Sequence, residues 1–301
     1  MADESEFRFY RYNPSLAANV VFIVLFAALS AGHLFQLIKR RTWYFIPFLI
    51  GCLFETFGYV ARVASSTETP NWTLTPFIIQ TLLILLAPAL YAASIYMVLG
   101  RLIRLLDAHQ HSLIRTNWLT KIFVLGDVLS FLTQSAGGGL LANATTASAQ
   151  STGKNVVLAG LGIQVIFFGL FILTTIVFHY RISKDPTARS LSVTTPWRLL
   201  VVALYFSSTL VMVRSVFRMV EYGMGNDGVL MRGEVWLFVF DGVLMMAVSA
   251  VFLWWYPGGI LVGYKGMGDG REEGFAMVGE AGEGGVSMDE RDRGKISRRW
   301  I

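Results

Sequence analysis

Cysteine is almost missing from this chain: Cys52 is the only one among 301 residues, and it lies inside an apolar segment. A single cysteine excludes an intramolecular disulfide framework, and no CxxC or Cys/His cluster with metal-site spacing is present. Walker A, HExxH and GxSxG motifs are absent as well. The sequence therefore predicts a protein that is not an enzyme and that needs neither a cofactor nor a metal ion.

Charged residues are also scarce. They make up 15% of the chain, whereas a soluble domain has about 25%. Hydrophobic residues account for 54% and the mean hydropathy is +0.55, which predicts an integral membrane protein. The net charge of +5 would also fit nucleic-acid binding. The Lys and Arg residues lie mainly between apolar runs, however, so membrane orientation explains them better and we expect no nucleic-acid partner.

Long apolar runs are what the sequence has in abundance. Seven of them reach the roughly 20 residues that a membrane-spanning helix needs. We therefore predict an all-α membrane protein with seven transmembrane helices in residues 16–257. The expected spans are Leu16–Ile38, Trp43–Ala64, Phe77–Leu99, Trp118–Leu141, Val156–Phe178, Arg198–Val220 and Val235–Tyr256.

The Lys and Arg residues indicate how these spans are oriented. Sixteen lie on one side, nine in loops and seven in the C-terminal segment, and four lie on the other side. Because basic loops stay cytoplasmic, we expect residues 1–15 to be extracellular and the C-terminus cytoplasmic. Glycosylation acceptor triplets at Asn71 and Asn143 fall in loops that this rule places outside. The glycine-rich, charged residues 258–301 predict a disordered cytoplasmic tail.

The second span carries a polar stripe. Glu55, Gly58, Tyr59 and Arg62 are spaced i, i+3, i+4 and i+7, so they share one face of a helix. An isolated charge in the middle of a membrane costs about 2.5–3.5 kcal/mol on insertion scales. This face must therefore point toward protein or water, and we expect other spans to carry polar partners for it.

Three further spans supply such partners. The fourth has Asp127, Ser130 and Gln134 on one face, followed by Gly137, Gly138 and Gly139, which allow close backbone approach or serve only for packing. The sixth and seventh spans add charged residues at similar depth. We predict one shared polar network opening toward the outer leaflet, with a substrate-binding site made of Glu55, Tyr59, Arg62, Asp127, Ser130, Gln134, Arg214, Arg218, Glu221 and Asp241.

Purely structural roles are the alternative interpretation of these residues. The intramembrane charges could be structural ion pairs that fix helix packing. Arg62, Arg218 and Glu221 lie near span ends, where long side chains reach the membrane interface.

The combined motifs resemble a known family. Glu55-x-x-Gly-Tyr-x-x-Arg62, Pro88 with Tyr91 and Tyr96, Asp127-x-x-Ser-x-x-x-Gln134 with its glycine run, Arg214-x-x-x-Arg218-x-x-Glu221-Tyr222 and Asp241 occur in this order. Together they are similar to the fungal lipid-translocating exporters, the RTA-like proteins named for resistance to aminocholesterol. The resemblance covers about residues 16–257.

The resemblance implies a seven-helix protein of the fungal plasma membrane that responds to stress. It implies export or flip of sphingoid long-chain bases and tolerance of toxic sterols, with porphyrin linked to some members. The family has no agreed catalytic residues, so no catalytic role carries over to any position of this chain.

Our interpretation from the sequence is a translocator of amphiphilic lipids that does not hydrolyse ATP, with membrane lipids or amphiphilic small molecules as its partners. Glu55, Asp127 and Asp241 could accept the amine of a long-chain base. The alternative is a seven-helix receptor or sensor that regulates lipid asymmetry or the stress response. Against it, Cys52 alone cannot form an outer-loop disulfide, and the last span lacks an NPxxY pattern.

Overall fold

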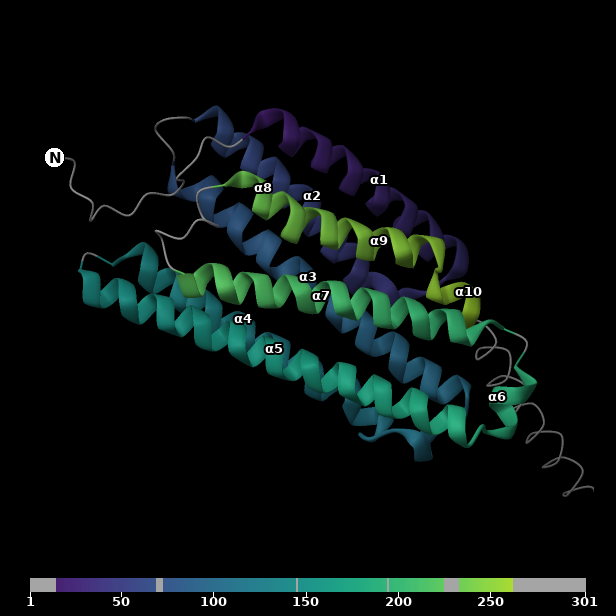
Figure 1. Ribbon diagram of the computed structural model, residues 1–301. Helices are drawn as coiled ribbons and strands as arrows, with labels where there is room; N and C mark the ends of the chain where they lie inside the picture. Colours follow the sequence, from purple (N-terminus) through teal and green to yellow (C-terminus); the bar gives the residue numbers. More distant parts are fainter. Residues whose placement is uncertain (1–14, 69–72, 145, 194, 225–232, 262–301) are drawn as a thin grey trace, which may run out of the picture. The chain divides into compact units, whose positions relative to one another are not determined.

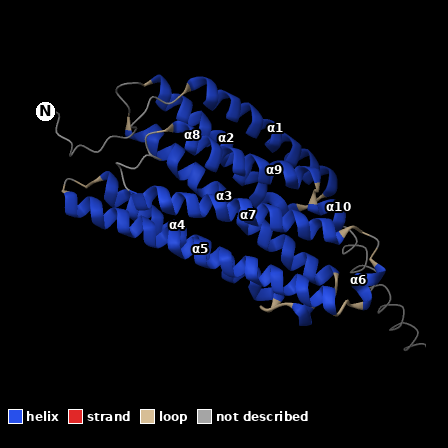
Figure 2. Cartoon of the chain, viewed as in Figure 1, coloured by secondary structure: helices blue, strands red, loops and turns tan. Residues whose placement is uncertain are grey.

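Helices account for every regular element in the residues that the structure describes, as Figure 2 shows. The structure is a computed structural model that describes residues 15–68, 73–144, 146–193, 195–224 and 233–261. The predicted extracellular segment before residue 15, the acceptor Asn71 and the tail from residue 262 lie outside these ranges. The elements are α1 (Leu16–Arg40), η1 (Trp43–Phe45), α2 (Ile46–Thr67), α3 (Leu74–Leu105), η2 (His109–His111), α4 (Thr116–Ala142), α5 (Ala147–Lys184), α6 (Ala188–Ser192), α7 (Trp197–Met224), α8 (Glu234–Leu237), η4 (Phe238–Val243), α9 (Leu244–Trp254) and α10 (Pro257–Leu261).

Six helical segments are long and apolar enough to cross a membrane, and each contains one predicted span. They are Leu16–Arg40, Trp43–Thr67, Thr75–Leu105, Ser148–Lys184, Trp197–Met224 and Glu234–Gly259. The remaining predicted span, Trp118–Leu141, lies within α4, a continuous helix of 27 residues whose polar side chains reduce its hydropathy. The chain is thus a multi-pass integral membrane protein, and six of the seven predicted spans are confirmed.

Local sequence features explain several helix ends. α1 begins after Ser15, whose hydroxyl oxygen caps the first turn. Its C-terminal cap is Arg41, which adopts a left-handed backbone with φ of 50°. α3 continues through Pro88 as one helix. Pro257 does more than close the last span, because it begins α10, so residues 258–261 of the predicted tail are helical.

The last predicted span contains a π-helical turn that the sequence did not reveal. It starts as α8, continues as the π-helical η4 and ends as α9. A π-helical turn is wider than an α-helical one because its hydrogen bonds run from residue i to i+5, and such turns are frequent at functional sites. Asp241 and Gly242 lie in this turn and are buried.

The long helices pack as a closed ring. Each helix contacts the next in the order α1, α2, α3, α4, α5, α7 and α9, and α9 in turn contacts α1. α3 and α7 also contact each other between the α4–α5 pair and the group formed by α1, α2 and α9 (Figure 1). Residues on α2, α3, α7 and η4 that face inward therefore meet in the middle of this ring.

Glycine allows α4 and α5 to pack closely. A Cβ atom on Gly160 would lie 2.9 Å from the backbone nitrogen of Gln134, and one on Gly137 would lie 2.7 Å from the backbone nitrogen of Val157. Gly138 has nothing within 4 Å of such a position. One member of the glycine run is therefore a packing site for α5, as small residues are between membrane helices.

The distribution of side chains is that of a membrane protein. Large apolar residues such as Val24, Leu125 and Ile166 are exposed on the outside of the helices. Charged residues such as Glu55 and Arg214 are buried instead. Charged side chains within membrane helices face the interior of the bundle because contact with lipid would cost free energy.

Candidate functional site

The polar stripe predicted on the second span faces the interior of the helix ring. Glu55, Tyr59 and Arg62 of α2 expose 1%, 0% and 1% of their surface. Gly58 lies on the same stripe against α3, where a Cβ atom would come within 2.7 Å of the Ile84 side chain. The absence of a side chain at Gly58 thus allows α3 to lie close beside this charged face.

An ion pair joins α7 to the π-helical turn. The Nε atom of Arg214 donates a hydrogen bond to Oδ1 of Asp241, and both side chains are buried. The Nη2 atom of Arg214 donates to the backbone carbonyl of Ile84 in α3 at 3.0 Å. Arg214 therefore connects three helical elements, and the carboxylate of Asp241 compensates its positive charge.

Glu55 lies beside this pair but forms no hydrogen bond with it. Neither of its carboxylate oxygens has a hydrogen-bond partner in the described part of the chain. Asp241 and Arg214 act on it electrostatically. The hydroxyl group of Tyr59, which the same groups influence, also lacks a hydrogen-bond partner there. Two carboxyl groups and one guanidinium group thus meet, which gives this inner cluster (Glu55, Tyr59, Arg214 and Asp241) one acid in excess.

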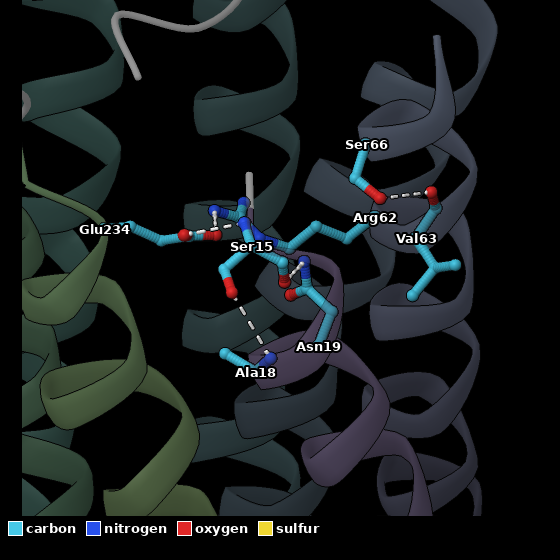
Figure 3. Close-up of polar contacts among 7 residues, drawn as sticks. All are labelled: Ser15, Ala18, Asn19, Arg62, Val63, Ser66 and Glu234. Carbon is cyan, nitrogen blue, oxygen red and sulfur yellow. Dashed lines mark hydrogen bonds and ion pairs between the residues drawn. The ribbon is translucent and has the colours of Figure 1, made fainter. Parts of the chain in front are cut away.

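A second ion pair lies at the end of α2. Nη2 of Arg62 donates to Oε1 of Glu234 at 2.9 Å, and the backbone N–H of Ser15 donates to Oε2 of the same carboxylate at 2.8 Å (Figure 3). The side-chain amide of Asn19 donates to the Ser15 carbonyl at 2.9 Å. These contacts, which we call the end clamp, tie the start of α1 and the start of α8 to the end of α2.

Aromatic rings lie between the end clamp and the inner cluster. The Phe22 ring stacks on Tyr59 at 5.1 Å and on Phe238 at 5.0 Å between centroids. The guanidinium group of Arg62 lies 5.8 Å from the centre of the Phe238 ring. A Cβ atom on Gly242 would lie 2.6 Å from the Tyr59 hydroxyl oxygen, so this position must be glycine for the rings to pack as they do.

Neutral polar groups continue the inner cluster on its other side. The Tyr91 hydroxyl donates to the Cys52 sulfur at 3.3 Å and accepts from the Ser249 hydroxyl at 2.9 Å. A ring nitrogen of His33 lies 3.0 Å from the Ser249 carbonyl oxygen. Four elements of the ring, α1, α2, α3 and α9, are thereby linked through buried polar contacts.

The predicted residues on α4 form a separate group. The Ser130 hydroxyl donates to the Gly160 carbonyl of α5 at 2.7 Å. The Gln134 amide donates to the Ser130 oxygen at 2.6 Å and to the Gln164 side chain of α5 at 3.3 Å. Ser130 and Gln134 therefore face α5 and not the inner cluster.

Asp127, Arg218 and Glu221 also lie apart from Glu55. Asp127 is buried and faces Tyr96 of α3. Arg218 and Glu221 pair with each other along α7, with 2.8 Å between Nη1 and Oε2. The structure thus brings together Glu55, Tyr59, Arg214 and Asp241, with Arg62 adjacent, and it divides the network that we expected to be continuous.

The predicted acceptor Asn143 lies at the end of α4. Its side chain is exposed, and its amide nitrogen donates to the Gly139 carbonyl at 2.9 Å. The site is thus accessible from the loop between α4 and α5.

Sequence reasoning missed two parts of the site. Glu234, directly before the last predicted span, was not among the predicted site residues, although a carboxylate at a span boundary is a natural partner for Arg62. Cys52, Tyr91 and Ser249 gave no signal as a group, because neutral polar residues are common in membrane helices.

The geometry allows a cation or a proton to be held. Among the described residues, no group of three or more His, Cys, Asp or Glu side chains is arranged to hold a metal ion. The inner cluster has a buried carboxyl group without a hydrogen-bond donor and a second one engaged by Arg214. Such a site suits a positively charged group that enters and leaves.

Comparisons with known proteins give a consistent picture. The family model described as RTA1 like protein matches residues 48–264. Protein RTA1 of Saccharomyces cerevisiae is 38% identical over 276 residues, which cover 83% of this chain and 85% of that protein. Protoporphyrin uptake protein 1 of the same yeast is 36% identical, with 83% and 92% covered. The yeast sphingoid long-chain base transporter RSB1 is 28% identical, with 80% and 70% covered. No solved structure matches the chain.

Proposed function

Since this chain belongs to the RTA1-like family, we propose that it moves amphiphilic lipids with a cationic headgroup, such as sphingoid long-chain bases, across a membrane without hydrolysing ATP. The name of one relative, a sphingoid long-chain base transporter, supports the substrate class. The role that we propose in the organism is resistance to toxic lipids under stress.

We further propose that α4 is the seventh span, that the N-terminus is extracellular and the C-terminus cytoplasmic, and that the protein resides in the plasma membrane. The asymmetry of Lys and Arg between the loops supports this orientation. α4 packs along α5 and α3 within the helix ring, as a spanning helix would.

The observation that carries the proposed function is the environment of Glu55. Its carboxyl group is buried, lacks a hydrogen-bond donor among the described residues and lies next to a carboxylate that Arg214 already compensates. An ammonium headgroup would supply both the missing charge and the missing donors. The alkyl chain would remain in lipid or between helices, where its burial costs nothing.

Each group of the inner cluster has a role in this proposal. Glu55 accepts the ammonium group, and the hydroxyl oxygen of Tyr59 provides a further acceptor beside it. The Arg214–Asp241 pair keeps its own charges balanced and holds α7 and η4 in place. The end clamp of Arg62 and Glu234 closes the site at the end where α1 and α8 begin, so it must open for a headgroup to pass. Asp127, which is buried on α4, is a candidate for a second contact of this kind.

Protoporphyrin is the competing substrate class, because one relative is named for its uptake. It carries two carboxylates, and the inner cluster offers them no available cation because Arg214 is already bound to Asp241. A receptor or regulator that binds the lipid without moving it is the competing type of activity.

Reconstitution into liposomes tests the proposal. The purified protein is assayed without nucleotide for movement of a fluorescent sphingoid base, with an aminosterol and protoporphyrin as comparisons. We expect the base to move faster than in protein-free vesicles and protoporphyrin not to move faster. Binding of the base without movement would favour the receptor, and absence of both would reject the proposed function.

Matched variants connect the movement to the site. Glu55→Gln removes the negative charge but keeps the shape of the side chain, and we expect it to abolish movement of the base. Glu68→Gln makes the same change at the exposed end of α2, about 20 Å farther along the helix, and we expect it to move the base as the wild type does. Equal rates in both variants would exclude Glu55 as the headgroup site.

A further inference from the structure

The carboxyl group of Glu55 must be neutral when the site is empty, because an unpaired buried charge in a membrane is strongly disfavoured. Titratable or charged groups from four elements act on it or feel its charge. These groups are Cys52 and Tyr59 of α2, Tyr91 of α3, Arg214 of α7 and Asp241 of η4. Arg214 is the cation among them.

Arg214 is not available to neutralise Glu55. Its Nε atom is bound to Asp241, and its Nη2 atom is bound to the Ile84 carbonyl. One guanidinium charge compensates one carboxylate, so Glu55 is left without a cation of its own among the described residues. Cysteine and tyrosine side chains are uncharged near pH 7 and add no positive charge.

Building on the function proposed above, we propose that Glu55 carries a proton in the empty site and releases it to water when a cationic headgroup binds. The protein then exchanges one proton for each lipid cation. In the binding step the O–H bond of the Glu55 carboxyl group breaks, and its electron pair stays on the carboxylate oxygen. The proton leaves to water, and the ammonium group forms an ion pair with the carboxylate. No covalent bond to the lipid forms, and the charge of the site is the same before and after.

Because the charge of the site is conserved, the movement of the proton is coupled to the movement of the lipid cation. A site that holds either the proton or the lipid cation is neutral at Glu55, whereas a site that holds neither has a bare buried carboxylate. The step that changes which side of the membrane the site faces is therefore open to the two neutral forms and closed to the charged one. A proton gradient can then drive the lipid cation in the opposite direction, which supplies an energy source without ATP.

Proton release during binding tests the inference in the wild-type protein. The protein in detergent is titrated with the N,N,N-trimethyl derivative of a long-chain base, which has a permanent charge and no proton of its own to lose. Calorimetry in two buffers with different ionisation enthalpies counts the protons released. We expect one proton per headgroup bound near pH 7. Binding without proton release would overturn the exchange and leave the proposed function intact, and absence of binding would overturn both.

Infrared difference spectroscopy of the wild type identifies the proton carrier without relying on a variant. We expect the carbonyl stretch of a protonated carboxyl group to disappear and a carboxylate signal to appear when the trimethylated base binds. In Glu55→Gln this change should be lost, whereas Glu68→Gln should retain it. A protonated-carboxyl signal that disappears equally in Glu55→Gln would show that another acid carries the proton.

Vesicles with a trapped pH indicator test the exchange across the membrane. The trimethylated base is added outside, so an uncharged form cannot cross by itself and mimic the effect. We expect the interior to become more alkaline as the lipid enters and protons leave, in wild type and Glu68→Gln but not in protein-free vesicles. Lipid entry with an unchanged internal pH would reject proton exchange while confirming translocation.

Discussion

The guanidinium group of Arg62 and the carboxylate of Glu234 lie 2.9 Å apart, although 172 positions separate them in the chain. Arg62 is buried at the end of α2, and Glu234 begins α8. The contact is thus a tertiary one that links the second span directly to the last. Its free energy can be measured, because each partner can be replaced singly and both together.

Replacing Glu234 by Gln should destabilise the protein more in the wild-type background than when Arg62 is Gln as well. Each single variant leaves one buried charge facing an amide. We expect a coupling free energy of about 0.5–3 kcal/mol, the range for residues in direct contact. Thermal unfolding of the four proteins in detergent gives this value. Strictly additive effects would show that the two side chains do not interact in solution.

Replacing a carboxyl group by an amide should affect stability differently at the two acids of the inner cluster. Asp241→Asn removes the partner of Arg214 and leaves a buried guanidinium group uncompensated, which should cost about 3–5 kcal/mol. Glu55→Gln removes no hydrogen bond within the described chain, so folding should be nearly unchanged. Yield of monodisperse protein and its unfolding midpoint measure both effects. A large loss for Glu55→Gln, with rescue by Arg214→Gln, would instead make Glu55 a structural ion-pair partner.

The glycines of α4 and α5 provide a matched pair of substitutions. Gly160→Ala would place a Cβ atom 2.9 Å from backbone atoms of Ser130 and Gln134, and overpacking of this kind costs about 1–3 kcal/mol. Gly138→Ala meets nothing within 4 Å and should stabilise the helix by up to about 1 kcal/mol. Unfolding in detergent compares them. Equal stability of the two variants would mean that α4 and α5 are not in close contact.

Cysteine labelling in intact cells tests the proposed orientation. The one native cysteine, Cys52, is buried, so an impermeant thiol reagent should leave the parent protein unlabelled. Ser148→Cys, at an exposed position in the first turn of α5, should react from outside. Gly270→Cys should react only after the cells are permeabilised. The opposite pattern would invert the topology and remove the basis for glycosylation at Asn71 and Asn143.

Charged residues within apolar runs could be identified from the sequence, because each must avoid lipid and therefore marks a buried face. Helical spacing correctly placed Glu55, Tyr59 and Arg62 on one inward stripe. It could not tell which neighbouring helix a stripe faces. The stripe of Ser130 and Gln134 has the same spacing, yet it packs on α5 and satisfies its hydrogen bonds there.

The pairing of charges depends on the order of helices around the ring, which spacing does not contain. From the sequence we predicted that the acids and the three arginines of the site share one polar network. In the structure Arg62 pairs with Glu234, and Arg218 pairs with Glu221 of its own helix. These contacts leave Glu55 without a cation of its own among the described residues, a result that no residue count predicted.

The π-helical turn at Phe238–Val243 sets the direction in which Asp241 points relative to Glu234. Both interhelical ion pairs depend on that direction. Glu234 and Asp241 are seven positions apart in the chain. Because each residue of an α-helix rotates by about 100°, they would share one face if the helix were uninterrupted. Their partners belong to different helices, Arg62 to α2 and Arg214 to α7. The π-helical turn rotates Asp241 away from the direction of Glu234, so that each acid can point toward its own arginine. If this turn adopted α-helical hydrogen bonds without a change in its length, both acids would lie in the same angular sector, where at most one pair could persist.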